Sequence, residues 1–279
     1  MTHWKAYHKV LIPCIPQVSE PEESIEEIKK LMKKSHCYMA RWTTDFDSDV
    51  YKDFYYLVCD KFIEVEDVEL RKVRNELRRA FKYCSVKIIS KKSLIEQGYN
   101  VYDKAFKKYI TNVNKMNKQQ FEEMVENLDE SIDIWGVFYD SILVGWGTVK
   151  VYDKFCDFQV VKYDPDFLKF EISAAINYSI NQYYIKKHNK FIIAGTKSLN
   201  HDTNIQNYLV KKFNYKRRYC KLHVVYIWYV QVLVRFLYPF RKFFYKFKTG
   251  VFSKIAVVLR HEEIIRSQKK LEVQLKNQM

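Results

Sequence analysis

The residues best suited to chemistry lie in the stretch Lys190–Lys221, where polar side chains follow a short apolar run. His201 is the best candidate for a general base, because a histidine side chain exchanges a proton near neutral pH. Asp202 follows it and could orient the imidazole, although capping the next helix is the commoner role for such an aspartate. Lys197 and Ser198 could contact a phosphate or a sugar hydroxyl, and a solvated turn is the alternative. The stretch therefore predicts a polar ligand site.

The elements that must position these side chains are a strand and a helix. Phe191–Ala194 is an apolar run of strand length, and Gly195 after it permits a sharp turn. Asn204 is one of three consecutive N-cap residues, and Asn214 is a plausible left-handed helix stop. Helical spacing between these two is carried by Ile205, Leu209 and Phe213. Because a helix N-terminus presents free N–H groups, we expect an anionic or polar ligand near Asn204.

Composition limits the class of protein and of partner. The chain has 279 residues, of which 48 % are hydrophobic and 16 % aromatic, so it has enough apolar residues for a globular core. Its formal net charge of +15 favours nucleic acid, a phosphorylated cofactor or an anionic membrane; a generally lysine-rich composition is the alternative. Six dispersed cysteines indicate reduced thiols and a cytoplasmic location. The chain opens without a signal-peptide pattern, and we expect no metal site, because metal-binding and nucleotide-binding motifs are absent.

Along the chain, the patterns predict an α/β (α+β) fold in three segments. Residues 1–83 form a smaller, partial α/β subdomain, residues 84–227 the main domain, and residues 228–279 a helical tail. A basic helix, Val68–Tyr83, has an apolar stripe of Leu70, Val73, Leu77 and Phe81. Its cations favour a phosphate-contacting surface, and a solvated basic face is the alternative.

The main domain has the element order β-α-α-β-β-β-α-β-α-β. Its predicted strands are Ser85–Ser90, Ile132–Tyr139, Ile142–Tyr152, Asp157–Lys162, Phe191–Ala194 and Tyr215–Tyr226. The predicted helices are Ser93–Ile110, Asn117–Leu128, Phe167–Lys187 and the one beginning near Asn204. Asp140-Ser141 should form the tight turn of a hairpin.

This order resembles the mixed sheet of the GNAT acyltransferase fold, over about Cys84–Tyr226. The segment Asn204–Tyr215 (NIQNYLVKKFNY) looks like the Asn-initiated helix and phenylalanine-containing turn that often close GNAT chains. The preceding small subdomain with its arginine-rich helix is similar to the FemAB-like branch of that fold. The resemblance implies an acyltransferase that moves an acetyl or aminoacyl group from an activated donor to an amine or hydroxyl. Acyl-CoA is the implied donor, and aminoacyl-tRNA is the alternative, with tRNA then a partner.

The resemblance also implies a site. Two parallel strands, Cys156–Lys162 and Lys190–Ala194, should part and admit the acyl donor, with Lys162 and Tyr163 at the turn that meets its diphosphate. Donor contacts are also expected from Gly195, Lys197 and Asn204. His201 would be the base. The usual tyrosine acid has Val210 at its matching position, so the nearby tyrosines Tyr208, Tyr215 and Tyr219 are the substitutes.

The turn at Asp164-Pro165-Asp166 departs from the glycine-rich pattern of the family, since carboxylates repel a diphosphate. This turn and Val210 favour a second hypothesis, a non-catalytic binding protein that retains the fold. A third hypothesis is a basic RNA-binding module, although the chain has no known RNA-binding motif.

The tail begins with an aromatic and basic segment, Trp228–Lys248. Gln231, Arg235 and Pro239 interrupt it too often for a membrane-spanning helix. Aromatic side chains interleaved with cations are typical of a segment that lies on an anionic membrane, and a helix packed on the core is the alternative. We therefore expect a cytoplasmic protein that can bind the inner membrane face and acts on a cell-envelope or polysaccharide precursor. Ile255–Leu275 should form a further amphipathic helix.

Overall fold

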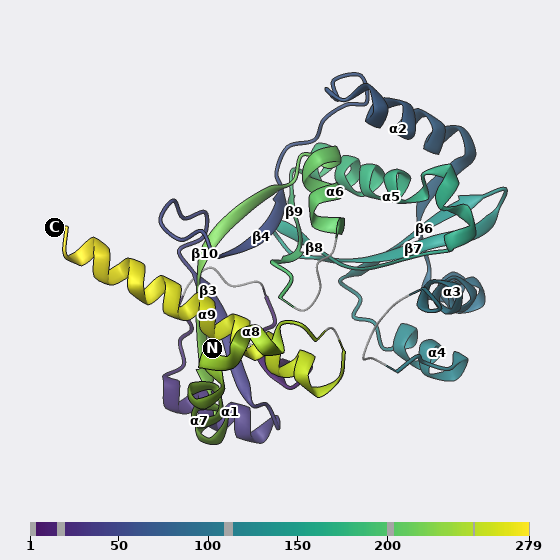
Figure 1. The fold of residues 1–279 in the computed structure, drawn as a ribbon. Helices are drawn as coiled ribbons and strands as arrows, with labels where there is room; N and C mark the ends of the chain where they lie inside the picture. Colours follow the sequence, from purple (N-terminus) through teal and green to yellow (C-terminus); the bar gives the residue numbers. More distant parts are fainter. Residues whose placement is uncertain (1–3, 16–19, 109–113, 200–203, 248, 279) are drawn as a thin grey trace. The chain divides into compact units, whose positions relative to one another are not determined.

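The structure is a computed structural model (Figure 1) that describes residues 4–15, 20–108, 114–199, 204–247 and 249–278. The chain forms two compact units. Unit 1 comprises residues 1–56, 196–203 and 217–279, and unit 2 comprises residues 57–195 and 204–216. The units thus alternate along the chain, whereas the sequence predicted three consecutive segments. The division into three consecutive domains therefore stays a prediction, because contacts within the structure do not test which segments fold independently.

Unit 2 is built on a mixed sheet with the strand order β9-β8-β7-β6-β5. Neighbours from β5 to β8 are antiparallel, while β8 and β9 are parallel. Asp140 and Ser141, at φ 45° and 67°, form the predicted hairpin turn between β6 and β7. The strands are β5 (Cys84–Ile89), β6 (Ile132–Tyr139), β7 (Ile142–Val151), β8 (Phe155–Tyr163) and β9 (Phe191–Thr196). The predicted α/β fold class is therefore confirmed.

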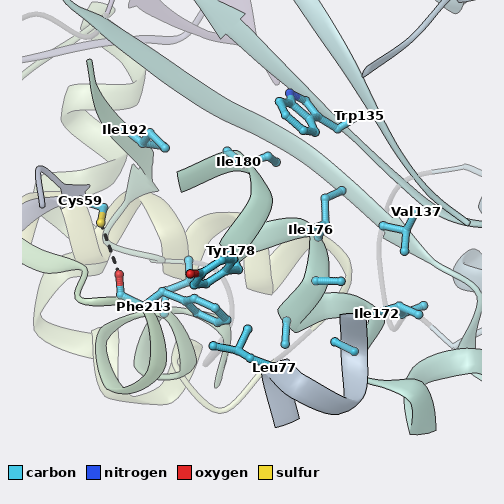
Figure 2. Packing of buried hydrophobic residues seen from close by; sticks show 14 of the residues in the cluster. Cys59, Leu77, Trp135, Val137, Ile172, Ile176, Tyr178, Ile180, Ile192 and Phe213 are labelled. Atoms are coloured by element: carbon cyan, nitrogen blue, oxygen red, sulfur yellow. Dashed lines mark hydrogen bonds between the residues drawn. The ribbon is translucent and has the colours of Figure 1, made fainter. Parts of the chain in front are cut away.

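Helices cover both faces of this sheet (Figure 1). One face packs against α2 (Arg71–Tyr83), α5 (Ile172–Asn181) and α6 (Asn204–Phe213) through a core that includes Leu77, Trp135, Ile176 and Phe213 (Figure 2). The other face packs against α3 (Lys91–Phe106) and α4 (Lys118–Glu126). Trp135 and Ile134 belong to different cores because adjacent strand residues point to opposite faces.

The segment predicted as one helix, Phe167–Lys187, is instead three short helical pieces. They are the 3-10 helix η1 (Pro165–Phe170), α5 and the π-helical turn η2 (Gln182–Lys187). Asp164 begins η1, because its side chain accepts a bond from the Asp166 N–H at 3.1 Å. Glu171 has a left-handed backbone with φ 60°, and this conformation separates η1 from α5. The prediction of one continuous helix was wrong.

The predicted basic helix is α2, and its buried stripe differs in part from the expected one. Val73 and Leu77 are buried as predicted, and Ala80 is buried with them. Leu70 and Phe81 were predicted wrongly, since their side chains are 53 % and 41 % exposed. For Leu70 the reason is that it is the N-cap residue of α2, so it lies outside the regular helical stripe.

Unit 1 has a smaller sheet with the order β1-β2-β3-β10, in which β2 and β3 are parallel and the other pairs antiparallel. One cluster joins α1 to Leu11 and Trp42, and another joins α7 and α9 to Met39 and Tyr226. The strands of this sheet are β1 (Trp4–Tyr7), β2 (Val10–Pro13), β3 (Met39–Thr44) and β10 (Lys216–Tyr226), and β4 (Phe54–Cys59) carries residues of both units. The helices are α1 (Ile25–Lys34), α7 (Trp228–Leu237), η3 (Tyr238–Phe240), α8 (Arg241–Phe244) and α9 (Gly250–Lys276).

Candidate functional site

The parallel strands β8 and β9 pair over only three residues. Phe155, Cys156 and Asp157 lie opposite Phe191, Ile192 and Ile193. Beyond these pairs β8 continues to Tyr163 and β9 to Thr196 without further pairing between them. The two strands therefore part after Asp157 and Ile193. The end of their pairing agrees with the prediction, and the entry of an acyl donor between them stays a prediction.

A bulge in β8 lies where this pairing ends. Thr148 of β7 is opposite Val160 and Val149 is opposite Phe158, so Gln159 is an extra residue in β8. A bulge bends its strand and increases the local twist, which carries the end of β8 away from β9. The close approach of β8 to β7 favours a glycine, because a Cβ at Gly147 would lie 3.0 Å from the Val160 oxygen, a tight contact.

The two predicted donor contacts at the end of β8 lie on opposite faces of the sheet. Lys162 is opposite Trp146, which belongs to the core under α3 and α4, and Tyr163 packs in the core under α5. Burial lowers the pKa of the Lys162 ammonium. The Tyr163 hydroxyl reaches α5 and lies 3.5 Å from the Asn177 side-chain nitrogen.

Three polar side chains recur every fourth residue along α5, and each meets a tyrosine hydroxyl. Ser173 lies 3.2 Å from the Tyr208 hydroxyl, Asn177 contacts Tyr163 as described, and the Tyr215 hydroxyl donates to Asn181 at 3.1 Å. We call Ser173, Asn177 and Asn181 the α5 polar row. Successive members are about 6 Å apart along the helix axis, since each residue rises about 1.5 Å. The row therefore brings the hydroxyls of Tyr163 and Tyr208 to within about one helical turn of each other.

Asn177 is the unsatisfied member of this row. Its side chain is 2 % exposed, and its Oδ1 atom has no hydrogen-bond partner among the described residues. Its Nδ2 atom donates to the Ser173 carbonyl at 2.7 Å. A buried acceptor without a donor costs free energy, so such an atom in a folded protein calls for an explanation. A ligand N–H or O–H group would supply the missing donor.

Tyr208, predicted as a catalytic acid, is a half-buried residue of α6. Burial raises the pKa of Tyr208 to about 12, although the Ser173 hydrogen bond works against this shift. The Lys212 ammonium lies 4.7 Å from the centre of its ring. Tyr208 therefore keeps its proton at neutral pH, as an acid or hydrogen-bond donor must. By contrast, Tyr215 is 2 % exposed and bonded to Asn181, which gives it a structural role.

The acidic turn after β8 is held by a lysine from α3. Lys104 Nζ lies 2.7 Å from Asp164 and 3.2 Å from Asp166, and Asp164 is 3 % exposed. These bonds raise the pKa of Lys104. At the start of α5, burial and the nearby Glu76 carboxylate raise the pKa of Glu171. A diphosphate at this turn would therefore meet carboxylates that already have structural partners.

Helix α2 presents a surface of cations on the outside of unit 2. Its buried residues face the core, and Glu76, its single acidic residue, pairs with Lys212 of α6. The exposed cations, which we call the α2 basic surface, are Arg71, Lys72, Arg78, Arg79 and Lys82.

The other predicted site residues are dispersed. Gly195 is the last residue of β9 that belongs to unit 2 and has φ 79°, and Asn204 is the exposed first residue of α6. Lys197 and Tyr219 belong to unit 1, where Lys197 donates to the carbonyls of Asp53 and Tyr55, and the Tyr219 ring contacts Tyr55. His201 lies outside the described residues. The structure thus places the hydroxyls of Tyr163 and Tyr208 against two residues of α5, Asn177 and Ser173, and the catalytic roles of all these residues stay predictions.

The sequence reasoning missed the α5 polar row. The signal was present, because a serine and two asparagines recur at a spacing of four in the mostly apolar segment Ile172–Asn181. Polar residues at that spacing share one face of a helix. A buried helix that keeps one polar face indicates a hydrogen-bonded site.

No protein-family model matches the sequence, and no curated protein sequence matches it. Among solved structures, FemX superposes with a TM-score of 0.52 at 9 % identity, covering 76 % of this chain and 77 % of FemX. The chain has a FemX-like fold. A putative lysylphosphatidylglycerol synthetase domain from Agrobacterium fabrum is more distant, with a TM-score of 0.49 at 12 % identity over 84 % of this chain and 82 % of that one. The FemX-like fold agrees with the predicted FemAB-like arrangement, and at this identity the likeness concerns the fold alone.

Proposed function

We propose that the protein is an acyltransferase whose donor acyl group enters between the parting strands β8 and β9. The observation that carries the proposal is the three-residue pairing of these strands, with a bulge where the pairing stops. Main-chain N–H groups of β8 beyond its pairing with β9 would polarise the acyl carbonyl of the donor. Asn177 supports a ligand at this place, because its buried Oδ1 needs a donor such as an amide N–H or a hydroxyl.

The proposed reaction is direct attack by an amine or hydroxyl of the acceptor on the donor carbonyl carbon. The new bond forms to that carbon, and the bond to the leaving oxygen or sulfur breaks. The acceptor proton passes to a base, for which His201 remains the candidate. Tyr208, whose pKa is raised to about 12, would protonate the leaving group and regain its proton from solvent. A cell-envelope or polysaccharide precursor is the proposed acceptor.

Of the two donors, we favour aminoacyl-tRNA over acyl-CoA. The turn that would hold a CoA diphosphate carries Asp164 and Asp166, and the following helix begins at Glu171. These carboxylates oppose a diphosphate. The α2 basic surface, in contrast, suits the phosphates of a nucleic acid.

The test compares binding and turnover of the two donors. Aminoacyl-tRNA binding should weaken with salt and with R78Q/R79Q, but not with K33Q/K34Q, which removes two exposed cations from α1 in unit 1. Calorimetry with acetyl-CoA tests the other donor. Y208F should lower the rate of acyl transfer from the donor to simple amine acceptors by about 100-fold, while the affinity for the donor stays within about twofold of the wild type. If neither donor binds, the proposal is wrong.

The second candidate function is a non-catalytic binding protein with the same fold. It is favoured by Val210, which packs against the core where the usual acid would stand, and by the Lys104-bound acidic turn. This protein would have kept the fold and lost the donor site, so this function predicts no saturable binding of acyl-CoA and no acyl transfer by the wild type. An RNA-binding module instead predicts equal affinity for charged and uncharged tRNA.

A further inference from the structure

Helix α7 in unit 1 is apolar on both its inner and its outer side. Val230, Val234 and Leu237, spaced by four and three residues, pack in the cores of unit 1. The outer residues Trp228 and Phe236 are 74 % and 70 % exposed. A surface helix of a water-soluble protein normally presents charged and polar residues outward, so this outer side has an unusual composition.

Exposed apolar side chains also occur in η3, α8 and the start of α9, which follow α7 in the chain. The rings of Phe243, Phe247 and Phe252 contact one another, with centroids 4.8 to 6.3 Å apart. Phe243 and Phe252 are nevertheless 53 % and 45 % exposed. We call the exposed members the aromatic surface: Trp228, Tyr229, Val232, Leu233, Phe236, Phe240, Phe243, Val251 and Phe252.

The charge of this segment has a single sign. Residues 228–254 contain no aspartate or glutamate, and their cations are Arg235, Arg241, Lys242, Lys246, Lys248 and Lys254. Arg235, Lys242, Lys246 and Lys254 are exposed. Cations beside exposed Trp, Tyr and Phe match the two layers of an anionic lipid surface, where phosphates lie next to acyl chains. Within the described residues, no helix is long and apolar enough to cross a bilayer.

We infer that the aromatic surface docks the protein onto an anionic lipid bilayer. Trp228 and Phe236 enter the headgroup boundary from one side of α7, and the flanking lysines meet lipid phosphates. This inference rests on unit 1 alone, so it stands or falls independently of the donor site in unit 2.

The experiment measures flotation of the full chain with phosphatidylcholine vesicles and with vesicles in which phosphatidylglycerol replaces part of that lipid. The wild type should float with the anionic vesicles, and high salt should weaken this binding. W228S/F236S should reduce binding at least about tenfold, since burial of one such side chain changes a partition constant by about that factor. The matched control is I142S/V273S, which removes two side chains that are 59 % and 58 % exposed elsewhere.

Trp228 also supplies a direct optical signal. The other four tryptophans, Trp4, Trp42, Trp135 and Trp146, are buried or half-buried. Emission should therefore shift to the blue on anionic vesicles, and W228F should abolish the shift while it keeps most of the binding. K242E/K246E should lose binding to anionic vesicles, whereas K269E/K270E, with two exposed lysines of α9, should retain it.

Three results would overturn the inference. The first is no flotation of the wild type with anionic vesicles. The second is equal flotation of wild type and W228S/F236S. The third is a wild-type dimer, by light scattering, that W228S/F236S dissociates without any vesicle binding, since this result identifies a second copy as the occupant. Donor binding by W228S/F236S serves as a folding control and should equal that of the wild type.

Discussion

Replacing Asn177 with leucine should leave stability unchanged or raise it, although the residue is buried and polar. The substitution removes the Oδ1 atom that has no partner among the described residues, which returns about 1–3 kcal/mol of desolvation cost. It also removes the Nδ2 bond to the Ser173 carbonyl, worth about 0.5–1.5 kcal/mol. The net change in the free energy of unfolding should therefore lie between about −0.5 and +2.5 kcal/mol.

Asn181 is the matched comparison on the same helix. Its Oδ1 accepts from the Tyr215 hydroxyl, and its Nδ2 lies 3.7 Å from the Cys59 sulfur. N181L would leave the buried Tyr215 hydroxyl without an acceptor and should cost about 1–3 kcal/mol. Equilibrium urea unfolding of both variants, at unchanged slope, measures the difference. Donor affinity should fall about tenfold or more in N177L. This loss is expected if Asn177 lowers the stability of the fold but contacts the donor.

The reasoning fails if N177L and N181L are destabilised by equal amounts. That result would mean that Asn177 is satisfied, for example by an ordered water, and that its Oδ1 atom does not indicate a ligand. A stable N177L variant with unchanged donor affinity would confirm that the Asn177 Oδ1 atom has no partner in the folded protein. It would also show that this atom does not contact the donor.

Two further substitutions test the strand end and the acidic turn. G195A should cost about 1–2 kcal/mol because φ is 79° there, while G195N should cost less, since asparagine tolerates this conformation; equal losses would contradict the backbone argument. K104M should lower the free energy of unfolding by about 1–2 kcal/mol. This is less than for a fully buried ion pair, because the Lys104 side chain is 35 % exposed and solvent screens its charge. Since Asp164 raises the pKa of Lys104 above its ordinary value of 10.5 in the folded state, this stabilisation is present below that pH and is lost as pH rises through the folded pKa. The free energies of unfolding of wild type and K104M should converge at alkaline pH. If their difference is the same at neutral and alkaline pH, the ion pair is not what stabilises the wild type.

The parts of the fold that local patterns specify were predictable. Ile132–Tyr139 is a strand with the predicted bounds, and the hairpin at Asp140-Ser141 follows from its turn residues. Asn214 ends α6 in the left-handed conformation, at φ 57°, as its residue type indicates. The helix breaks around Glu171 were not predictable, because this left-handed conformation is imposed by packing and not favoured by a glutamate.

For the site, the sequence located the strands but not the groups between them. The parting of β8 and β9 was expected from the resemblance, whereas the bulge at Gln159 depends on pairing with β7. The α5 polar row has a visible spacing, but only the folded chain shows which tyrosine each member meets. Tyr163 lies in β8, Tyr208 in α6 and Tyr215 just before β10, up to 52 positions apart in sequence, and no local pattern relates them.

The pairing of β3 with β10 has a consequence for how the chain is made. Met39 lies opposite Tyr226, so the strand near the start of the protein waits for a partner that the ribosome produces almost at the end. Most of unit 2 is synthesised in between and can condense first, since its antiparallel neighbours follow one another closely. During translation β3 therefore has one edge without a partner until β10 is made, and such an open strand edge in the nascent N-terminal segment is a place where a chaperone can bind.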